Sequence, residues 1–338
     1  MPDQERSPRA RLLDLIVAFR QSQCIRVAVE LGLPDHLAEH PMSEADLARV
    51  CDVAPPMLRR FLRALIAIGL VELEGDGRYA LTAMGRALGS DGLGPVAIFF
   101  GADPTWSVWG ALGNSIRTGQ QAFDRVYGNP DCWEYYAENP RAAIEFDAAM
   151  ASLTGGTSDA VVDSFDFGRF HTVVDVGGGD GTLLSMILRR HPRVRGVLYD
   201  VAHVVDRAHQ VLGAAGIADR CEVRSGDFRV EVPTGGDCYL LKWIVHDWDD
   251  DGCRAILGAC RRAMDEWSRL VLVERVLPEK TRPGDLDGPL ADLMMLVMAN
   301  GKERTEQEFA ELLAECDFRL DRVRPTGTNV NVLEAVPV

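Results

Sequence analysis

A short apolar segment that runs directly into a glycine-rich loop constrains the fold most strongly. Residues 172–176 read Thr-Val-Val-Asp-Val, and residues 177–181 follow at once as Gly-Gly-Gly-Asp-Gly. A helical pattern begins at Thr182. A buried strand, a glycine turn and a helix are typical of the first unit of a doubly wound parallel sheet, in which ligands bind beyond the carboxyl ends of the strands.

The remainder of the C-terminal half repeats this alternation of strands and helices. Apolar runs at 197–199, 238–241 and 270–273 predict further strands, with helical stretches between them. Near the end, residues 318–324 and 330–336 flank a Pro-Thr-Gly-Thr turn, which predicts an antiparallel hairpin. We therefore predict an α/β fold, a Rossmann-like doubly wound domain with a C-terminal antiparallel hairpin.

The N-terminal part has a different pattern. Residues 7–31 show helical periodicity, and residues 33–89 read as helices followed by a strand-turn-strand segment at 70–81, which is a winged-helix pattern. Residues 33–89 carry six basic and eight acidic side chains, a net charge of −2, which gives no positive field for duplex DNA. We expect a structural or dimerising role, with a winged-helix, ligand-sensing DNA-binding protein as the alternative.

The glycine loop also indicates the kind of ligand. Glycines at 177, 179 and 181 give Gly-x-Gly-x-Gly, and Thr182 stands where the dinucleotide fingerprint requires glycine. Asp180 would repel a pyrophosphate, whereas an S-adenosyl ligand carries a positive ammonium and sulfonium that acids favour. We therefore prefer an S-adenosyl cofactor. An NAD-dependent oxidoreductase and an ordinary strand-to-helix turn are the alternatives.

Two further acids stand where neighbouring strands end. Asp200 follows the second strand and is placed to accept both ribose hydroxyls, although a helix N-cap is the alternative. Residues 225–228, Ser-Gly-Asp-Phe, come at the end of the third strand. Asp227 is placed there to accept the adenine amino group, and Phe228 to stack on the ring. Alone, this tetrapeptide would be an ordinary turn.

A histidine at the end of the fourth strand is the candidate base. Residues 241–248 read Leu-Lys-Trp-Ile-Val-His-Asp-Trp, so His246 lies on the same rim of the sheet as the glycine loop. An unperturbed histidine pKa of about 6.5 suits a general base. Glu274 ends the fifth strand and is a candidate to orient the imidazole. The alternatives are a capping histidine and a salt bridge from Glu274 to Arg275.

In combination, the motifs DVGGGDG, LYDVAHVV, GDF, LKWIVHDW, LVERVLP and GKERTEQEF resemble those of the plant-type class I O-methyltransferase family, most closely its bacterial branch that tailors aromatic natural products. The resemblance covers almost the whole chain. It implies S-adenosylmethionine as cofactor, S-adenosylhomocysteine as product, SN2 transfer to a phenolic hydroxyl of a small aromatic intermediate, and a homodimer. Related hydroxylases and decarboxylases are the alternative, but the intact His246-Asp247 pair favours methyl transfer.

The resemblance also assigns roles to individual residues. The catalytic group comprises His246, Asp247, Glu274 and Glu303. The cofactor group comprises Asp175, Gly177, Gly179, Asp200, Val201, Gly226, Asp227, Phe228, Lys242 and Trp243. For contact with the acceptor, the resemblance gives Phe146, Met150, Met294 or Met295, and Met298, and the aromatic content of the helical segment adds Phe100 and Trp106. We expect three parts: a dimerisation and winged-helix domain at 1–93, a helical linker at 94–165 that contributes to the acceptor pocket, and a cofactor-binding catalytic domain at 166–338.

Composition excludes several other classes. The eight cysteines and seven histidines form no zinc-type spacing, so we expect no metal. A net charge of −15 argues against a nucleic-acid or anionic-membrane partner. The charged N-terminus shows no apolar leader, and the apolar runs are too short to span a bilayer. These features predict a cytoplasmic enzyme.

Overall fold

The computed structural model describes residues 7–129 and 132–338, so the first six residues of the charged N-terminus lie outside the described part. The chain divides into two compact units. The N-terminal unit comprises Met1–Gly110 and Trp133–Leu153, and the C-terminal unit comprises Ala111–Cys132 and Thr154–Val338. The segment 94–165 is thus shared between the units, and the three-part division at residues 93 and 165 stays a prediction.

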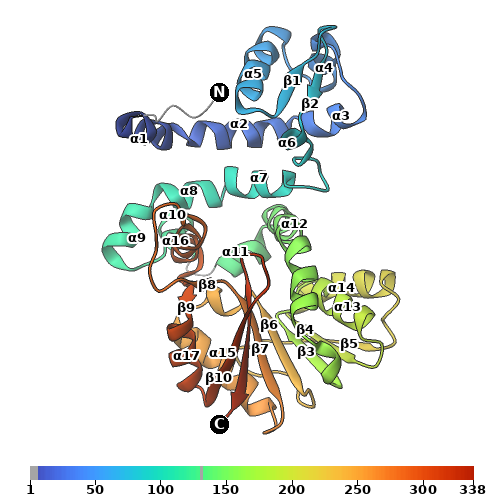
Figure 1. The fold of residues 1–338 in the computed structure, drawn as a ribbon, viewed down its shortest axis with the longest axis vertical. Coiled ribbons are helices and arrows are strands. Elements are labelled where there is room, and N and C mark those ends of the chain that lie inside the picture. Colours follow the sequence, from blue (N-terminus) through green and yellow to red (C-terminus); the bar gives the residue numbers. More distant parts are fainter. Residues whose placement is uncertain (1–6, 130–131) are drawn as a thin grey trace. The chain divides into compact units, whose positions relative to one another are not determined.

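The N-terminal unit contains the expected helices followed by a hairpin (Figure 1). Its first elements are α1 (Pro8–Val17), α2 (Phe19–Glu30), α3 (Leu33–Glu39), α4 (Glu44–Val50), α5 (Pro55–Ile68), β1 (Val71–Leu73), β2 (Tyr79–Leu81) and α6 (Ala83–Arg86). The strands β1 and β2 pair antiparallel. The periodic segment 7–31 is two helices instead of one, because the Ala18 N–H bonds to the Leu15 carbonyl only three residues back.

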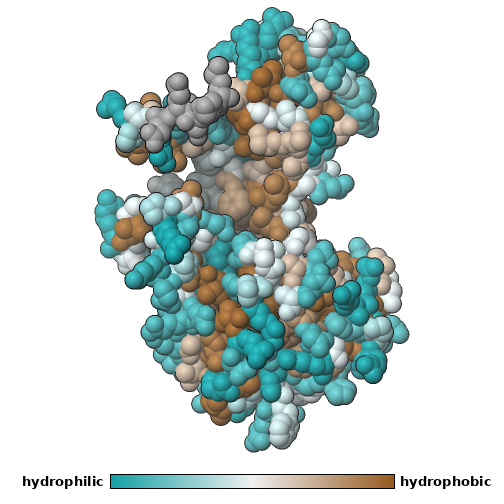
Figure 2. Space-filling model, in the orientation of Figure 1, coloured by the Kyte–Doolittle hydropathy of each residue, from teal (hydrophilic) through white to brown (hydrophobic). Residues whose placement is uncertain are grey.

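Apolar side chains of this unit divide into a core and an exposed set. Leu47, Leu58 and Leu62 are wholly buried beneath the hairpin. By contrast, five large apolar side chains of α1 and the start of α2 are more than half exposed: Leu12, Leu13, Leu15, Ile16 and Phe19. Apolar patches interrupt the polar surface of this unit in Figure 2. A partner surface would be needed to shield this apolar face from water.

The middle of the chain is helical, as expected, and its helices belong to both units. They are α7 (Gly94–Gly101), α8 (Thr105–Gly110), α9 (Leu112–Thr118), α10 (Ala122–Tyr127), α11 (Cys132–Glu138) and α12 (Pro140–Ser164). Helices α9 and α10 lie in the C-terminal unit, where both contact α16 (Asp287–Ala299).

A seven-stranded sheet organises the C-terminal unit, with strand order β10-β11-β7-β6-β3-β4-β5 (Figure 1). Its parallel strands are β3 (Thr172–Val176), β4 (Arg195–Asp200), β5 (Cys221–Ser225), β6 (Cys238–Lys242) and β7 (Arg269–Glu274). One strand, β11 (Asn331–Pro337), pairs antiparallel with β7, and the edge strand β10 (Phe318–Pro325) pairs antiparallel with β11. The doubly wound sheet and the final hairpin are therefore confirmed.

The other elements of the C-terminal unit pack around this sheet. They are a 3-10 turn η1 (Phe167–Arg169), α13 (Thr182–Arg190), α14 (Ala202–Ala214), a 3-10 turn η2 (Val245–Asp247), α15 (Asp250–Ala263), β8 (Val276–Leu277), β9 (Arg304–Thr305) and α17 (Glu306–Ala314). Among the described helices, none is both long and apolar enough to cross a bilayer.

Four of the parallel strands, β3, β4, β6 and β7, are buried on both faces, whereas the edge strand β5 is partly exposed. Consecutive residues of β3, Val173 and Val174, enter two separate apolar clusters, one on each side of the sheet. This explains why the strands read as continuous apolar runs. The strand order reverses between β3 and β6, so the loops that follow these two strands lie at the switch point where ligands bind in such sheets.

Candidate active site

The glycine loop after β3 is shaped for close approach of a ligand. Gly177, Gly179 and Gly181 have φ values of 69°, 60° and 82°, in the left-handed region that favours glycine. A Cβ on Gly177 would lie 2.4 Å from the Ile244 side chain, whereas a Cβ on Gly179 would meet no atom within 4 Å. The backbone at Gly179 therefore borders open space.

Acidic groups beneath and beside this loop fit a cationic ligand. Asp175 is 2% exposed, and its Oδ2 accepts no hydrogen bond within the described part of the chain. Burial raises the pKa of Asp175 to about 7; Lys242 opposes this rise, and Asp200 and Asp180 add to it. Burial also lowers the pKa of Lys242 to about 8. A positively charged ligand at the loop would favour the ionised form of Asp175.

The carboxylate of Asp200 joins the loop to the next strand. Its Oδ2 accepts the Gly179 N–H at 2.9 Å, and its Oδ1 accepts the Val201 N–H at 2.7 Å. At the end of β5, a Cβ on Gly226 would lie 2.0 Å from the Tyr199 hydroxyl, so only glycine fits there. The predicted cofactor residues that follow β3, β4 and β5 thus lie at the same carboxyl edge of the sheet.

Asp227 and Phe228 complete this edge in different ways. Asp227 is ion-paired with Arg229 at 2.9 Å, and the Arg229 hydrogen bonds hold its pKa below the ordinary value despite partial burial. Phe228 lies edge-on to Trp248, with ring centroids 6.3 Å apart. The carboxylate is therefore preorganised by a neighbour, which the sequence pattern did not indicate.

The turn after β6 gathers His246 and three carboxylates. His246 is 12% exposed, and its Nδ1 lies 3.3 Å from Oε1 of Glu303 and 3.8 Å from Oε2 of Glu274. Its Nε2 lies 3.5 Å from Oδ1 of Asp247. All four residues of the predicted catalytic group are thus brought together, and the shortest side-chain contact of the imidazole is with Glu303.

The charges in this cluster change the expected acidity of the histidine. Burial lowers the pKa of His246, but the carboxylates of Asp247, Glu274 and Glu303 outweigh burial and raise it to about 10. Burial also raises the pKa of Glu274 to about 7 and that of Asp247 to about 6, against the lowering effect of His246. The ordinary value of about 6.5 therefore does not apply to this imidazole.

Glu274 acts mainly on the backbone of the turn. It is wholly buried, and its Oε1 accepts the N–H groups of Ile244 (3.1 Å) and Val245 (2.8 Å). Immediately before them, Trp243 has a φ of 53°, which is strained for a bulky residue, and its ring lies 6.3 Å from the His246 ring. Glu274 thus holds the turn that presents His246.

Sequence reasoning missed Asp292 and Arg304 of this site, and it considered Arg275 only as a partner of Glu274. Arg275 pairs with Glu303 at 2.8 Å and with Asp287 at 3.0 Å, not with Glu274. Asp292 on α16 accepts the Glu303 N–H at 3.0 Å. Arg304 contacts the turn itself. The only available signal was position, since the two arginines directly follow Glu274 and Glu303 in the sequence.

Predicted acceptor residues lie in both units. In the N-terminal unit, Phe146 packs among Phe99, Trp133 and Tyr136, with ring centroids 4.9–5.7 Å apart. Phe100 and Trp106 are exposed and Met150 is half-buried. In the C-terminal unit, α16 carries the three methionines, of which Met294 and Met298 are buried and Met295 is half-buried.

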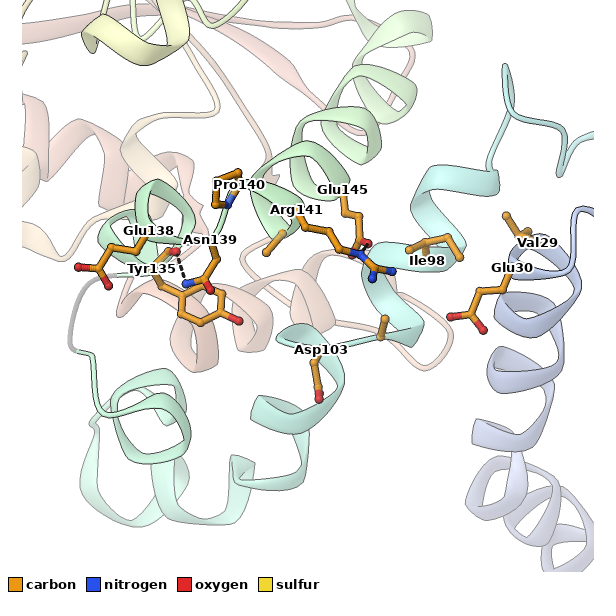
Figure 3. A pocket seen from close by; sticks show the side chains of 12 residues that line it. Val29, Glu30, Ile98, Asp103, Tyr135, Glu138, Asn139, Pro140, Arg141 and Glu145 are labelled. Carbon is orange, nitrogen blue, oxygen red and sulfur yellow. Dashed lines mark hydrogen bonds and ion pairs between the residues drawn. The ribbon is translucent and has the colours of Figure 1, made fainter.

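The N-terminal unit also contains a cavity of about 760 Å³ (Figure 3). Its lining includes Val29, Ile98 and Tyr135, together with the Arg141–Glu145 ion pair. None of the predicted cofactor, catalytic or acceptor residues lines it.

A doubly wound sheet with an acid-rimmed glycine loop and a carboxylate-held histidine at its switch point defines an enzyme that binds a nucleoside-type, positively charged cofactor. The chain belongs to the O-methyltransferase family. Residues 109–319 match its O-methyltransferase domain, and residues 13–91 match its O-methyltransferase dimerisation domain.

Known relatives agree with this assignment over nearly their whole length. The phenazine O-methyltransferase PhzM of Lysobacter antibioticus is 39% identical, with 97% of this chain and 96% of that protein covered. The 8-amino-8-demethylriboflavin N,N-dimethyltransferase of Streptomyces davaonensis is 34% identical, with 98% and 96% covered. A crystal structure of the O-methyltransferase NcsB1 from neocarzinostatin biosynthesis, in complex with S-adenosylmethionine and 2-hydroxy-5-methyl naphthoic acid, superposes with a TM-score of 0.81 at 30% identity, with 94% and 96% covered.

The cofactor of this chain is accordingly S-adenosylmethionine, and the acid-rimmed loop at Gly179 fits its positive charge. The expected family, fold class and cofactor are thus confirmed. The resemblance to a natural-product branch is confirmed as well, since relatives such as PhzM belong to it.

Proposed function

We propose that this chain methylates a phenolic hydroxyl of a small aromatic natural-product intermediate, with His246 as the general base. The observation that carries the proposal is the position of His246. Its imidazole lies at the carboxyl end of β6, next to the strand that leads into the glycine loop, and is held by Glu303 and flanked by Asp247. A base is useful only where the acceptor oxygen meets the methyl donor.

The contacts of the imidazole favour one direction of proton transfer. When Nδ1 carries its proton, it donates to Oε1 of Glu303. The lone pair of Nε2 is then free to accept the hydroxyl proton of the acceptor as the new oxygen–carbon bond forms. Asp247 and Glu274 stabilise the imidazolium that results, since their carboxylates raise its pKa.

The raised pKa of His246 suits a phenolic acceptor. An ordinary histidine would take a proton from a phenol of pKa about 10 against a difference of more than three pKa units. The carboxylates around His246 raise its pKa and so reduce this difference, which makes proton transfer less unfavourable. The cost is that a smaller fraction of the enzyme holds a neutral imidazole at neutral pH.

S-adenosylmethionine supplies an electrophilic methyl group on a positively charged sulfonium, for displacement in line by the acceptor oxygen. Asp175 and the backbone at Gly177 and Gly179 would hold its methionine part. Asp200 would accept the ribose hydroxyls, with Val201 beside it. Lys242 and Trp243 adjoin the cofactor in this proposal, and the remaining contacts, to adenine, come from the 226–228 segment, Gly226, Asp227 and Phe228.

An aromatic acceptor is supported by NcsB1, whose crystal structure contains a naphthoic acid, and by the apolar, adaptable methionines of α16. The acceptor contacts of Phe100, Trp106, Phe146, Met150, Met294, Met295 and Met298 stay predictions. Because one relative is an N,N-dimethyltransferase, an aminophenol assayed by mass spectrometry would test the preference for oxygen. Transfer to nitrogen alone would contradict the proposal.

The decisive test is His246→Ala. We expect kcat for methyl transfer from labelled cofactor to a phenolic acid or polyketide to fall about 10²- to 10⁴-fold, because the proton acceptor is lost. Calorimetric affinity for S-adenosylhomocysteine should be unchanged. His171→Ala is the matched control, since His171 is 96% exposed and lies before β3 at the other end of the strand. A near-normal rate in His246→Ala would refute the base assignment.

We also propose that the enzyme is a homodimer. The dimerisation-domain match covers residues 13–91, and this stretch includes most of the exposed apolar side chains of α1 and α2. Pairing of these faces would remove them from water. Light scattering of the purified protein should give twice the monomer mass.

A further inference from the structure

The segment from Gly301 to Arg304 packs against the His246 turn and the start of the helix that follows it. A Cβ on Gly301 would lie 2.0 Å from the His246 carbonyl oxygen, so the two backbones touch only because glycine is present. Lys302 pairs with Asp250 at 3.1 Å, just beyond the turn. Glu303 contacts the imidazole, as described above. The fourth residue, Arg304, has no role in the proposal made so far.

Arg304 is wholly buried and binds the backbone on both sides of the His246-Asp247 pair. Its Nη1 donates to the Val245 carbonyl at 3.1 Å, and its Nη2 donates to the Trp248 carbonyl at 3.2 Å. Nη2 also donates to Oδ1 of Asp250 at 2.7 Å, which compensates the buried charge. A planar guanidinium can reach these acceptors together, whereas a lysine ammonium reaches only a subset of them.

The turn depends on such external contacts because its own hydrogen bonds are long. The Asp247 N–H bonds to the Ile244 carbonyl at 3.2 Å, and the Trp248 N–H bonds to the Val245 carbonyl at 3.4 Å. Glu274 accepts the N–H groups at the start of the turn, and Arg304 donates to carbonyls within it and at its end. The turn is thus held by the Glu274 carboxylate at its start and by the Arg304 guanidinium within it and at its end.

We propose that Arg304 is a positioning residue for proton abstraction: it fixes the 245–248 backbone so that the His246 imidazole meets the acceptor hydroxyl. This inference rests on the proposed function of His246 as the base. Arg304 itself, being wholly buried, touches neither cofactor nor acceptor. Substitution of Arg304 should therefore lower kcat most for acceptors whose hydroxyl most needs a base to remove its proton.

The test uses Arg304→Lys with a series of substituted phenols of falling pKa. For the least acidic phenol we expect kcat to fall about 100-fold, as for a misplaced catalytic group. For the most acidic phenol, which is already ionised in solution, the loss should shrink to about tenfold or less. Affinity for S-adenosylhomocysteine should stay unchanged. Arg254→Lys is the matched control, because Arg254 lies on α15 and pairs with two exposed acids, Asp251 and Glu315.

His246→Ala measured on the same series separates the two proposals. If its loss also shrinks with acceptor acidity while that of Arg304→Lys is uniform or absent, the positioning role of Arg304 is overturned. If the loss in His246→Ala is itself uniform across the series, the base assignment fails instead, and the role of Arg304 fails with it.

Should Arg304→Lys not fold, Asp250→Asn puts the same question. Asp250 is partly exposed and accepts from Nη2 of Arg304 at 2.7 Å, so the substitution loosens the guanidinium without removing it. We expect about a tenfold loss with the same dependence on acceptor acidity, the size of one charged hydrogen bond. A uniform loss, or none, would count against the proposal.

Discussion

The glycine loop and the His246 turn lie at the ends of adjacent strands, β3 and β6, but they handle charge in opposite ways. At the loop, Asp175 keeps a buried carboxylate oxygen that accepts no hydrogen bond within the described residues. At the turn, Glu303 is already paired with both His246 and Arg275. The loop thus retains negative charge for a cation that arrives from outside, whereas the turn contains its own cation. The first arrangement suits binding and the second suits proton transfer.

Among the variants that test this difference between the loop and the turn, Asp200→Ala should have the largest effect, on cofactor affinity. The substitution removes the acceptor of the Gly179 and Val201 N–H groups as well as the proposed ribose ligand. Loss of the two proposed hydrogen bonds from the ribose hydroxyls to this carboxylate, about 1.5 kcal/mol each, corresponds to a loss in S-adenosylhomocysteine affinity on the order of 100-fold. Calorimetry measures this directly, and acceptor proton transfer, tested as kcat at saturating cofactor, should change far less.

Asp227→Ala provides the matched control for that variant. Asp227 is 40% exposed and already paired with Arg229, so its removal should weaken cofactor affinity only about tenfold. Equal losses in the two variants would remove the distinction between a ribose-binding and an adenine-binding acid.

Asp175→Asn tests whether the buried negative charge of Asp175 destabilises the enzyme without cofactor. The folded-state pKa of Asp175 is raised from 3.8 to about 7, so the native state favours the protonated form. The free energy of unfolding of the native enzyme without cofactor should therefore decrease as pH rises from about 4 to about 7. Asparagine removes this penalty and should stabilise the protein by about 2 kcal/mol at pH 8, within the roughly 4 kcal/mol that three pKa units represent.

The same variant should bind the cofactor more weakly, because the carboxylate no longer attracts its positive charge. Thermal unfolding at several pH values, with and without S-adenosylhomocysteine, measures both effects. A variant that is less stable than the native enzyme at pH 8 would contradict a destabilising effect of the Asp175 charge.

The loop was easier to predict than the turn for a physical reason. Its strand, glycines and helix are consecutive in the sequence, so local patterns specify them. Strand β3 has the bounds that the sequence predicted, and α13 begins at the predicted residue. The turn is assembled from residues after β6, after β7 and around 301–304. The motifs predicted that Glu274 and Glu303 belong to the site. No local pattern shows that Glu303 contacts the imidazole more closely than Glu274 does.

The acidity of His246 could not be read from the sequence at all. A strand-end histidine predicts a group of ordinary pKa, whereas three surrounding carboxylates raise it to about 10. Likewise, the left-handed backbone of Trp243 and the buried position of Arg304 are set by tertiary contacts and not by residue preference. Fold prediction needs only the repeating pattern, whereas the chemistry of the site depends on distances between segments remote in sequence.

The smallest predicted effect, a shift of about one pKa unit, tests whether the turn supplies its own charge balance. Glu303→Gln removes a carboxylate 3.3 Å from His246, which disfavours the imidazolium, so the pKa of His246 should fall. Arg275→Gln removes the cation paired with Glu303, so the pKa of His246 should rise. Nitrogen NMR titration of the His246 imidazole, assigned with His246→Ala, measures both shifts without an acceptor. Asp287→Asn, at the exposed side of Arg275, should leave the titration almost unchanged. Shifts in the same direction for the two variants would mean that Arg275 does not act through Glu303.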